Sequence, residues 1–247
     1  MSKFLIGIDL GTTNSALAYI DLQESKGKTG VPKIHPFRVP QLVAQGEVGQ
    51  RDLLPSFLYL PGQHDLPAGE TALPWDPACS WAVGEFARNQ GAKVPGRLAT
   101  SAKSWLCHAG VDRSAPLLPW SAPPDVQRLS PVEVSTRYLK HLVDAWNQVM
   151  AAGKSEQRLE KQAVVLTVPA SFDDMARTLT VEAARKAGLE DLTLVEEPQA
   201  AFYCWLATHP PKEAAQIKPG ANCLVVDVGG GTSDFSLIQA IEQQGEL

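Results

Sequence analysis

Two stretches of the chain combine aspartate, glycine and threonine in an order that could hold a polyphosphate. One spans residues 4–15 and the other residues 225–234, and an offset of 218 residues (227 minus 9) places Asp227 on Asp9. Glycine lets the backbone approach a ligand closely, and successive N–H groups in a tight turn bind phosphate oxygens. The aspartates suit Mg²⁺, which takes oxygen ligands and retains several waters. Phosphate and magnesium chemistry is therefore the first hypothesis for both stretches.

Each stretch also has the pattern of two strands joined by a turn. An apolar run precedes the aspartate, small residues follow it, and a second apolar run begins at residue 16 in one copy and residue 235 in the other. Two such hairpins facing each other would clamp a polyphosphate from both sides. A run of three glycines alone is more often a plain flexible turn, and the aspartates alone could be turn formers at strand ends. The repetition of the whole pattern favours the functional interpretation.

Composition limits the classes of protein to which the chain could belong. Of its 247 residues, 44% are hydrophobic and 20% are charged, which is typical of a soluble globular protein. The net charge is −5 and there is no dense basic run, so nucleic acid is not expected as a partner. The apolar run at residues 4–10 is too short for a membrane span or a signal sequence. We therefore expect a cytoplasmic protein without a membrane partner, whose four cysteines are reduced and buried.

The middle of the chain predicts the elements of a sheet covered by helices. Ser130, Pro131 and Glu133 form a capping box at the start of a one-faced helix that ends at Gly153. The apolar run at residues 163–168 is typical of a strand covered on both faces. The other expected elements are a helix from Asp173 or Asp174 to Gly188, a strand at residues 192–195 and a helix that opens at Pro198. Strands that alternate with helices in this way indicate an α/β fold.

We expect the chain to be divided into two lobes of unequal length. Residues 1–215 would form the first lobe, in which residues 34–39 and 51–60 are further candidate strands. Within that lobe, residues 62–129 are rich in proline and tryptophan and show no long periodic helix, so they would form an inserted subdomain. Residues 216–247 contain the second glycine-rich stretch and would begin a second lobe that is truncated.

Residues 4–15, 168–177, 196–201 and 227–234 form four motifs in this order along the chain. Together they resemble the nucleotide-binding domain of the DnaK-type, seventy-kilodalton heat-shock chaperones, within the actin and sugar-kinase superfamily. The first glycine-rich stretch is similar to that family's first phosphate loop, and residues 227–234 are similar to its second loop, DLGGGTFD. Residues 168–177 resemble its VPA-x-F segment, and residues 196–201 resemble its NEPTAA segment. The resemblance implies an actin-like, ribonuclease H-like ATPase lobe with an inserted subdomain, followed by the first hairpin of a second, missing lobe.

The resemblance also implies roles for single residues in binding and hydrolysing ATP with Mg²⁺. Asp9 and Asp227 would bind Mg²⁺ through its waters, and Glu197 would order those waters or the attacking water. Lys103 would reach the γ-phosphate, and Asp234 would lie near the attacking water. The phosphate-binding residues would be Gly11, Thr12, Thr13, Asn14, Gly229, Gly230, Gly231 and Thr232. Phosphoryl transfer is catalysed mainly by positioning and charge neutralisation, so these groups suffice without a covalent nucleophile.

Some of these residues have simpler interpretations, and some positions depart from the family pattern. Lys103 could be a solvated lysine, and Glu197 could be an acidic residue favoured in the first turn of a helix. Ser171 replaces an aromatic residue of the family, Glu196 an asparagine and Ser233 a phenylalanine. The departures describe a diverged paralogue. The family assigns Pro169 and Arg177 to relaying the nucleotide state to a substrate-binding domain.

The expected function is an ATP-binding and ATP-hydrolysing module of a heat-shock-type chaperone, which couples the nucleotide state, ATP or ADP, to binding and release of unfolded protein. Client polypeptides would bind through domains missing here, with co-chaperones as further partners. The intact protein would be an ATPase, whereas this truncated chain alone would be inactive. Two alternatives stay open: a sugar-kinase-like phosphotransferase, which would need a base aspartate at a substrate hydroxyl, and a non-catalytic interaction protein on the same fold.

Overall fold

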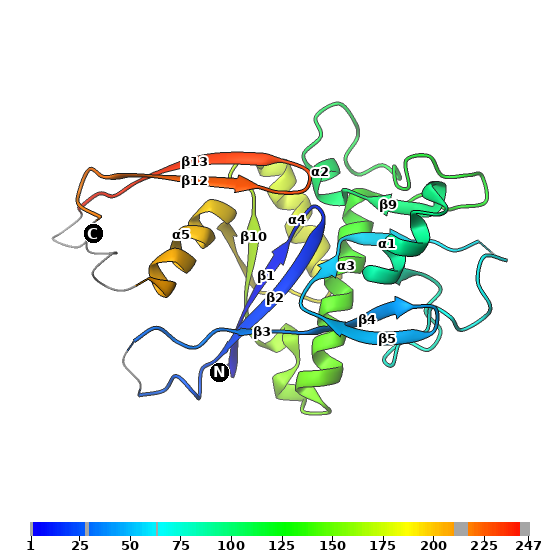
Figure 1. Cartoon of the computed structure of the whole chain (residues 1–247), viewed down its shortest axis with the longest axis horizontal. Helices are drawn as coiled ribbons and strands as arrows, with labels where there is room; N and C mark the ends of the chain where they lie inside the picture. The colour runs from blue at the N-terminus through cyan, green and yellow to red at the C-terminus, as the bar shows by residue number, and fades with distance from the viewer. Residues whose placement is uncertain (1, 28–29, 63, 210–216, 243–247) are drawn as a thin grey trace.

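A mixed β-sheet lies at the centre of the computed structural model, which describes residues 2–27, 30–62, 64–209 and 217–242 (Figure 1). Its strands, in spatial order, are β11 (Leu192–Glu196), β10 (Ala163–Val168), β1 (Phe4–Leu10), β2 (Asn14–Asp21) and β3 (His35–Pro36), with β6 (Leu54–Pro55) also paired to β2. β1, β10 and β11 run parallel, whereas β1 and β2 form an antiparallel hairpin. The carboxyl ends of the three parallel strands therefore meet at one edge, where the first glycine-rich loop follows β1.

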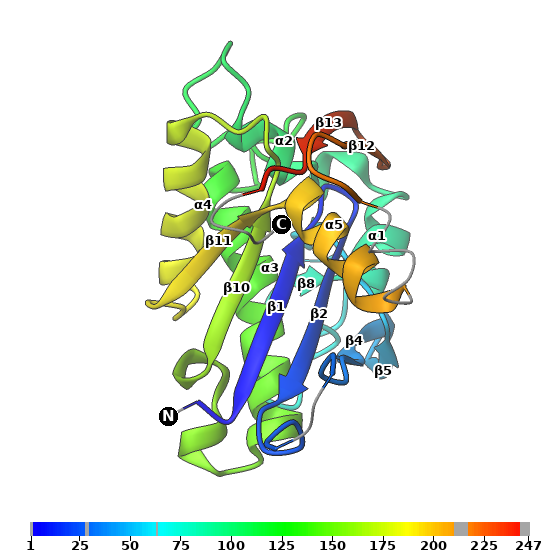
Figure 2. The ribbon, with the colours of Figure 1, turned by 90° about the vertical axis from the view of Figure 1, so that its left-hand side faces the viewer.

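Helices cover both faces of this sheet. α3 (Pro131–Trp146) and α4 (Asp174–Lys186) lie on one face, and α5 (Glu197–Thr208) lies over the other (Figure 2). The predicted capping box is confirmed at the start of α3. There, the N–H of Glu133 donates to the Ser130 hydroxyl at 3.1 Å, and the N–H of Ser130 donates to the Glu133 carboxylate at 2.7 Å. The helix thus begins where its local sequence satisfies two otherwise unpaired backbone donors.

The ends of the predicted elements agree with the structure to different degrees. α4 begins after Asp173, whose carboxylate accepts the N–H of Ala176 at 2.8 Å, and it ends before Gly188, which has a φ of 100°. The α3 helix stops earlier than predicted, because a π-helical turn, η2 (Asn147–Ala151), replaces its last turn. The predictions for residues 34–39 and 51–60 were only partly right. β3, β4 (Val39–Ala44), β6 and β7 (Phe57–Tyr59) are short and interrupted.

The apolar core lies between the sheet and the α3–α4 layer. Alternate residues of β1 and β10 point into it and are buried: Phe4, Ile6, Ile8 and Leu10 from β1, and Val164, Leu166 and Val168 from β10. The residues between them, among them Asp9 and Thr167, face the other side of the sheet. The prediction that residues 163–168 form a strand covered on both faces was therefore only partly right, since α5 lies over the second face but Val165 and Thr167 of β10 line a cavity there.

The segment between β3 and α3 forms two small sheets and two short helices. β4 pairs with β5 (Glu47–Arg51), and β7 lies between β8 (Ala82–Val83) and β9 (Leu98–Thr100). The helices are α1 (Glu85–Gly91), which packs on β4 and β7, and α2 (Ala102–Leu106), which packs on α3. Residues before position 62 thus share a small sheet with the predicted insertion. For the site, the important element is α2, because it carries Lys103.

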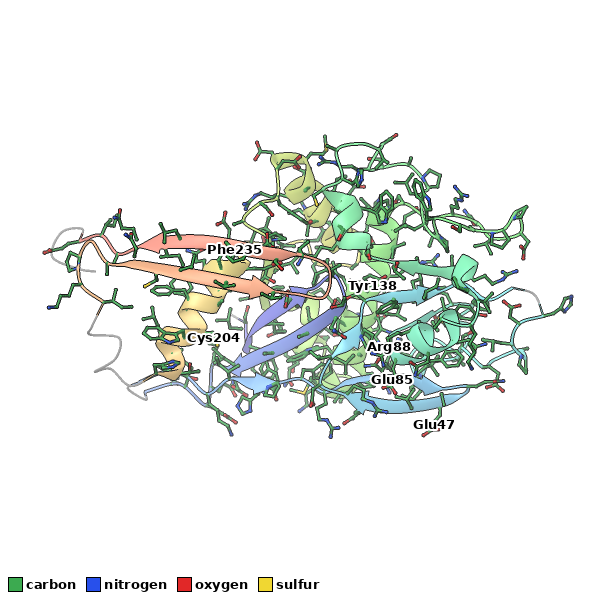
Figure 3. The ribbon with its side chains drawn as sticks, turned by 45° about the horizontal axis from the view of Figure 1, so that its top comes forward. Glu47, Glu85, Arg88, Tyr138, Cys204 and Phe235 are labelled. Atoms are coloured by element: carbon green, nitrogen blue, oxygen red, sulfur yellow. The ribbon has the colours of Figure 1, made fainter. Side chains whose placement is uncertain are left out.

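The second glycine-rich stretch joins β12 (Asn222–Val228) to β13 (Ser233–Gln239). These strands form a two-stranded sheet of their own, and α5 packs on β12. Apolar side chains project from the outer face of this hairpin. Phe235 on β13 is 69% exposed, in contrast to Tyr138 inside α3, which is 2% exposed (Figure 3).

The structure also bears on two expectations drawn from composition, which concern the cysteines and membrane-spanning helices. The four cysteines are free thiols, but only Cys79 is buried, while Cys107 and Cys204 are exposed and Cys223 is half-buried. The prediction that all four are buried was therefore wrong. Within the described ranges, no helix has both the length and the apolar character needed to cross a membrane.

Candidate functional site

Both glycine-rich loops open onto one cavity of about 650 Å³, which lies over the open face of the sheet. Strands β1, β2 and β10, helices α2 and α5, and the β12–β13 turn all contribute to its wall. The predicted site residues that line it are Asp9, Gly11, Thr12, Thr13, Asn14, Lys103, Glu197, Asp227, Gly229, Gly230, Gly231 and Thr232. The fold therefore brings together residues from the two ends of the chain and from its middle.

The turn of the second hairpin lies directly against the turn of the first. A methyl group added to Gly230 would come within 2.6 Å of the Thr13 side chain, and one added to Gly231 within 2.9 Å of the Thr12 side chain. Real Cβ atoms do not approach other atoms so closely, so the two glycines allow the turns to meet without moving a threonine. The two loops predicted to clamp a phosphate thus face each other in contact.

The first loop is braced by a residue that the sequence analysis did not single out. The N–H of Ser56 donates to the Thr13 carbonyl at 2.9 Å, and its hydroxyl donates to the Gly11 carbonyl at 2.8 Å. The same hydroxyl lies 2.9 Å from that of Ser15. The loop closes so tightly that a Cβ on Gly11 would lie 2.1 Å from the Asn14 carbonyl oxygen. No local pattern marks Ser56 as part of the site, since it meets the loop only through tertiary pairing.

Asp9 is oriented by a second residue that was missed. The parallel register of β1 and β10 places Thr167 opposite Asp9, and the threonine hydroxyl donates to Asp9 Oδ1 at 2.9 Å. Thr167 is a polar residue inside the apolar run of residues 163–168, and this is the one sequence signal it carries. The bond fixes how the Asp9 carboxylate faces the cavity.

Lys103 and Glu197 form an ion pair across the cavity, from α2 to the first turn of α5. Their side chains are 10% and 18% exposed. Burial raises the pKa of the Glu197 carboxyl above its ordinary value, and the charge of Lys103 acts against this effect. The neighbouring carboxylates of Asp9 and Asp227 raise the pKa of Glu197 further. The charges of two aspartates and one lysine therefore act on Glu197 at the centre of the site.

The two aspartates of the second hairpin have different surroundings. Asp227 and Asp234 are opposite each other in the β12–β13 register. Asp227 lines the cavity, whereas Asp234 lies in a small adjoining pocket with Pro169 and Pro198, which Asp227 and Glu197 also border. Asp234 is thus separated from the cavity wall by its neighbours, and its predicted place near the attacking water stays a prediction.

The acidic groups of the cavity are spaced for a hydrated metal ion and not for direct ligation. In the part of the chain that the structure describes, no three His, Cys, Asp or Glu side chains are close enough together to bind a metal directly. The prediction requires a looser arrangement, in which Asp9 and Asp227 contact Mg²⁺ through its waters. Burial is the main cause of the raised pKa of Glu197, and the negative charges of Asp9 and Asp227, which add to it, are what a hydrated cation would offset. The donor set therefore fits a hydrated Mg²⁺.

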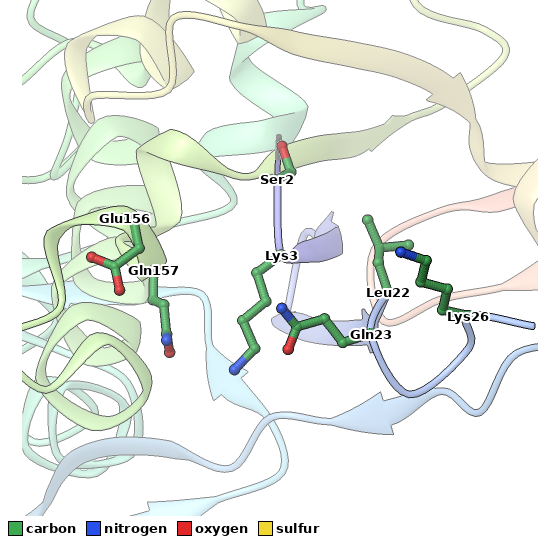
Figure 4. Close-up of a pocket in the computed structure, with 7 residues that line it drawn as sticks. All are labelled: Ser2, Lys3, Leu22, Gln23, Lys26, Glu156 and Gln157. Atoms are coloured by element: carbon green, nitrogen blue, oxygen red, sulfur yellow. The ribbon is translucent and has the colours of Figure 1, made fainter.

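A second hollow, of about 730 Å³, lies at the opposite end of β1 from the glycine-rich loops. Its lining consists of Ser2, Lys3, Leu22, Gln23, Lys26, Glu156 and Gln157 (Figure 4). The polar groups of Lys3 serve the fold, because its N–H donates to Gln162 at 3.0 Å and its ammonium lies 3.8 Å from Asp21. None of the glycine-loop residues borders this hollow, so we assign the site to the first cavity.

Comparison with known proteins identifies the family of the chain. The model of the family described as "Hsp70 protein" matches residues 83–246. The chain is 32% identical over 247 residues to the chaperone protein HscA homolog of Bordetella pertussis, covering 96% of this chain and 32% of that protein. It is 28% identical over 250 residues to the chaperone protein dnaK of Cyanidioschyzon merolae, covering 95% and 33% respectively. This chain belongs to the Hsp70 family.

The resemblance inferred from the four motifs is thereby confirmed. A further relative, the heat shock 70 kDa protein BIP3 of Oryza sativa subsp. japonica, is 35% identical over 174 residues, covering 63% of this chain and 24% of that protein. The chain spans about a third of the length of the Hsp70 relatives that it matches along most of its sequence.

One departure from the Hsp70 pattern has a visible partner. Glu196 accepts a hydrogen bond from the Arg177 guanidinium at 2.8 Å, and the same guanidinium donates to the Phe172 carbonyl at 3.1 Å. The carboxylate that replaces the family's asparagine therefore ties the end of β11 to α4. No comparable contact explains Ser171 or Ser233.

Proposed function

We propose that this chain is an ATP-binding and ATP-hydrolysing module of an Hsp70-type chaperone. One observation carries the proposal. The turns of two separate hairpins meet at Gly230 and Thr13, beside a cavity that also collects three carboxylates and a lysine. A polyphosphate needs backbone donors on more than one side and a cation to offset its charge; the two turns would supply the donors, and the carboxylates would hold the cation. The chaperone assignment rests on family membership.

The loops would hold the phosphates. Residues 11–14 and 229–232 line the cavity, so their backbone N–H groups would be the donors, apart from that of Gly229, which donates to the Thr232 carbonyl at 2.9 Å. The hydroxyls of Thr12 and Thr13 would add donors on the side where the turns meet. Ser56 keeps the first loop in this shape through its bonds to the Gly11 and Thr13 carbonyls. Such preorganised donors bind charge without a further cost of reorganisation.

Asp9 and Asp227 would hold Mg²⁺ through its waters, and Thr167 would keep Asp9 oriented for that task. When bound, the metal neutralises charge on the phosphate oxygens and favours departure of ADP. The excess of carboxylates over lysines around Glu197 is consistent with this requirement.

Glu197 would orient the water that attacks the γ-phosphorus. In that step a water oxygen forms a bond to phosphorus, and the bond to the β–γ bridging oxygen breaks, with its electron pair leaving on ADP. A carboxylate whose pKa is raised by burial is suited to accept the proton of the attacking water. Lys103 holds Glu197 in place and would also serve the γ-phosphate, while Asp234 would act from the adjoining pocket.

We further propose that residues 1–215 form the first lobe of an actin-like ATPase, with an insertion at about residues 62–129, and that residues 216–247 begin the second lobe. The separate β12–β13 sheet supports this division. The nucleotide state would control binding and release of unfolded polypeptides by other parts of the protein, with co-chaperones as partners, in the cytoplasm. The relatives named as chaperones support this role.

The test is a titration of Mg·ATP followed by amide NMR, which detects binding even at millimolar affinity. Amide shifts should concentrate at Gly11 and at residues 229–232, and both Asp9→Ala and Asp227→Ala should abolish them. Asp52→Ala is the control, because that carboxylate is 76% exposed and pairs with Arg38 rather than with the cavity. Unchanged loop amides at millimolar Mg·ATP would contradict the proposal and favour the non-catalytic interaction protein.

A further inference from the structure

Lys103 lies on a helix too short to be stable by itself. α2 has five residues, and Ser101, which precedes it, has a left-handed φ of 56° and makes no side-chain capping bond. A single helical turn is unfavourable in isolation, and a non-glycine residue in the left-handed region adds strain. Some other part of the molecule must therefore hold α2 so that Lys103 reaches Glu197.

A stack of three aromatic rings lies on this helix. The ring of Trp105 stacks against that of Trp120, with centroids 4.8 Å apart and planes at 16°. The ring of Trp105 also stacks against His108, with centroids 5.3 Å apart and planes at 23°. Trp105 is packed against the main core, but Trp120 is 55% exposed. Trp120 thus lies outside the core, and its ring stacks on the helix that carries Lys103.

Both outer rings of the stack are anchored to the rest of the fold. Leu118, two residues before Trp120, exchanges backbone hydrogen bonds with Leu129 at 2.9 and 2.6 Å, just before α3 begins. On the other side, Arg113 donates to the His108 carbonyl at 3.3 Å and pairs at 2.8 Å with Asp173, the capping residue of α4. The stack therefore connects α2 to the starts of both α3 and α4.

We propose that Trp120, stacked on Trp105, is a positioning residue that holds Lys103 against Glu197. This inference rests on the proposed function, because the ion pair matters for the reaction only if the cavity hydrolyses ATP. The positioning itself can be measured without nucleotide. A result that contradicts the positioning role is therefore distinct from one that contradicts the proposed ATPase function, because the latter is tested by Mg·ATP binding at the loops.

The first measurement is the rate of reductive methylation of Lys103, followed by mass spectrometry of peptides. In Trp120→Ala the rate should rise about threefold to tenfold, the contribution of one aromatic pair to a local equilibrium. Lys140, paired with Asp144 on α3, is the internal reference and should not change. Trp120→Phe, which keeps a ring to stack, should restore most of the protection. Trp120→Leu replaces the alanine variant if that variant does not fold.

The matched control is Tyr203→Ala. Tyr203 is also 55% exposed, and it lies on α5, the helix that carries Glu197, but it makes no contact in the stack. This variant should leave the methylation rate of Lys103 unchanged. Equal rates in Trp120→Ala and the unaltered chain, or an equal rise in Tyr203→Ala, would overturn the proposal.

The second measurement is the pKa of Glu197, obtained by carbon-detected NMR of the side-chain carboxyl. Lys103→Met shows the effect of losing the ammonium, which should raise the pKa further because Lys103 opposes the effect of burial. Trp120→Ala should move the pKa in the same direction as Lys103→Met, by a smaller amount. No shift, or a shift in the opposite direction, would show that Trp120 does not position the lysine.

Discussion

The two glycine-rich hairpins share one pattern and one register but have opposite surroundings. In both, the residue seven positions after the aspartate lies opposite it, Ala16 for Asp9 and Asp234 for Asp227. Three apolar positions of the first strand are 0%, 1% and 2% exposed in the first hairpin, at Ile6, Ile8 and Leu10. Their equivalents, Leu224, Val226 and Val228, are 62%, 49% and 72% exposed.

The local sequence therefore determines the hairpin and its turn. The burial of the hairpin's apolar side chains depends instead on the strands and helices that pair with it and pack on it. The first hairpin has β10 on one side and α3 beneath it, so its apolar residues contribute to the main core. The second pairs with no other strand in the described ranges. The two turns can therefore have similar shapes for binding phosphate, although only the first hairpin contributes apolar residues to the main core.

The largest difference is expected when isomeric side chains at equivalent positions of the two hairpins are each truncated to alanine. Ile6→Ala should lower the free energy of unfolding by about 2–5 kcal/mol, because it empties part of a closed core. Leu224→Ala removes the same number of carbons from a mostly exposed site, and should change stability by no more than roughly 0.5 kcal/mol. Urea denaturation of the two variants measures both values. Similar losses would mean that the second hairpin is packed more tightly than its exposure indicates.

A second pair of substitutions compares the two turns. A Cβ on Gly11 would lie 2.1 Å from a backbone oxygen, whereas one on Gly229 would lie 3.5 Å from its nearest neighbour, the Thr232 carbonyl oxygen. Gly11→Ala should therefore cost about 1–3 kcal/mol of stability, the usual range for overpacking a rigid site, and Gly229→Ala less than about 1 kcal/mol. The same denaturation experiment measures the difference, and a larger cost at Gly229 would contradict this account of the first turn.

Acid should destabilise the folded chain through His141, which is buried on α3. Burial lowers the pKa of this histidine from 6.5 to about 4, and its Nε2 donates to the Pro40 carbonyl at 2.9 Å. As the pH falls, the unfolded chain therefore binds the proton before the folded chain does. The contribution of neutral His141 to the free energy of unfolding is complete above pH 6.5 and is lost as the pH falls toward 4. The expected slope from this residue is about 1.4 kcal/mol per pH unit.

The measurement is the free energy of unfolding of the chain and of His141→Gln between about pH 7 and pH 5. Glutamine can keep the bond to Pro40 without titrating, so the variant should show a shallower slope. Parallel slopes would show that other groups cause the loss of stability in acid.

The smallest effect is expected at the rim of the sheet. Arg177 and Glu196 are 28% and 43% exposed in their side chains, so solvent screens their attraction. Glu196→Gln should cost roughly 0.2–1 kcal/mol, and added salt should reduce the difference. Thermal unfolding at low and high salt measures this effect. A loss as large as that of Ile6→Ala would mean that the pair connects β11 to α4 more strongly than its exposure allows.

The parts of the structure that sequence reasoning predicted well are those with a local cause. The capping box at Ser130 and Glu133, the cap at Asp173 and the stop at Gly188 each depend on residues a few positions apart. The two glycine-rich turns belong to the same class. For these features, neighbouring side chains and backbone groups satisfy one another whatever the rest of the chain does.

The parts that could not be predicted depend on contacts between distant segments. Ser56 and Thr167 join the site through strand pairing, and neither is part of a motif. The open face of β10 could not be distinguished from a covered one, because Val165 is apolar although it lines the cavity. The role of Lys103 was inferred from the family resemblance, and its pairing with Glu197 became visible only when α2 and α5 were placed together.

The bonds of Ser56 have a consequence for how a ligand enters. The first turn is fastened at Gly11 and Thr13 to a neighbouring segment, whereas the backbone bond from the Gly229 N–H to the Thr232 carbonyl, at 2.9 Å, is internal to the second turn. The two turns touch beside the cavity, so a phosphate bound there would lie between one turn that is fastened to a neighbouring segment and one that, within the described residues, is not. The first turn would then act as a fixed jaw and the β12–β13 hairpin as the moving one. A hairpin of seven-residue strands is roughly 20 Å long, so a small tilt at its turn moves its far end by a larger distance.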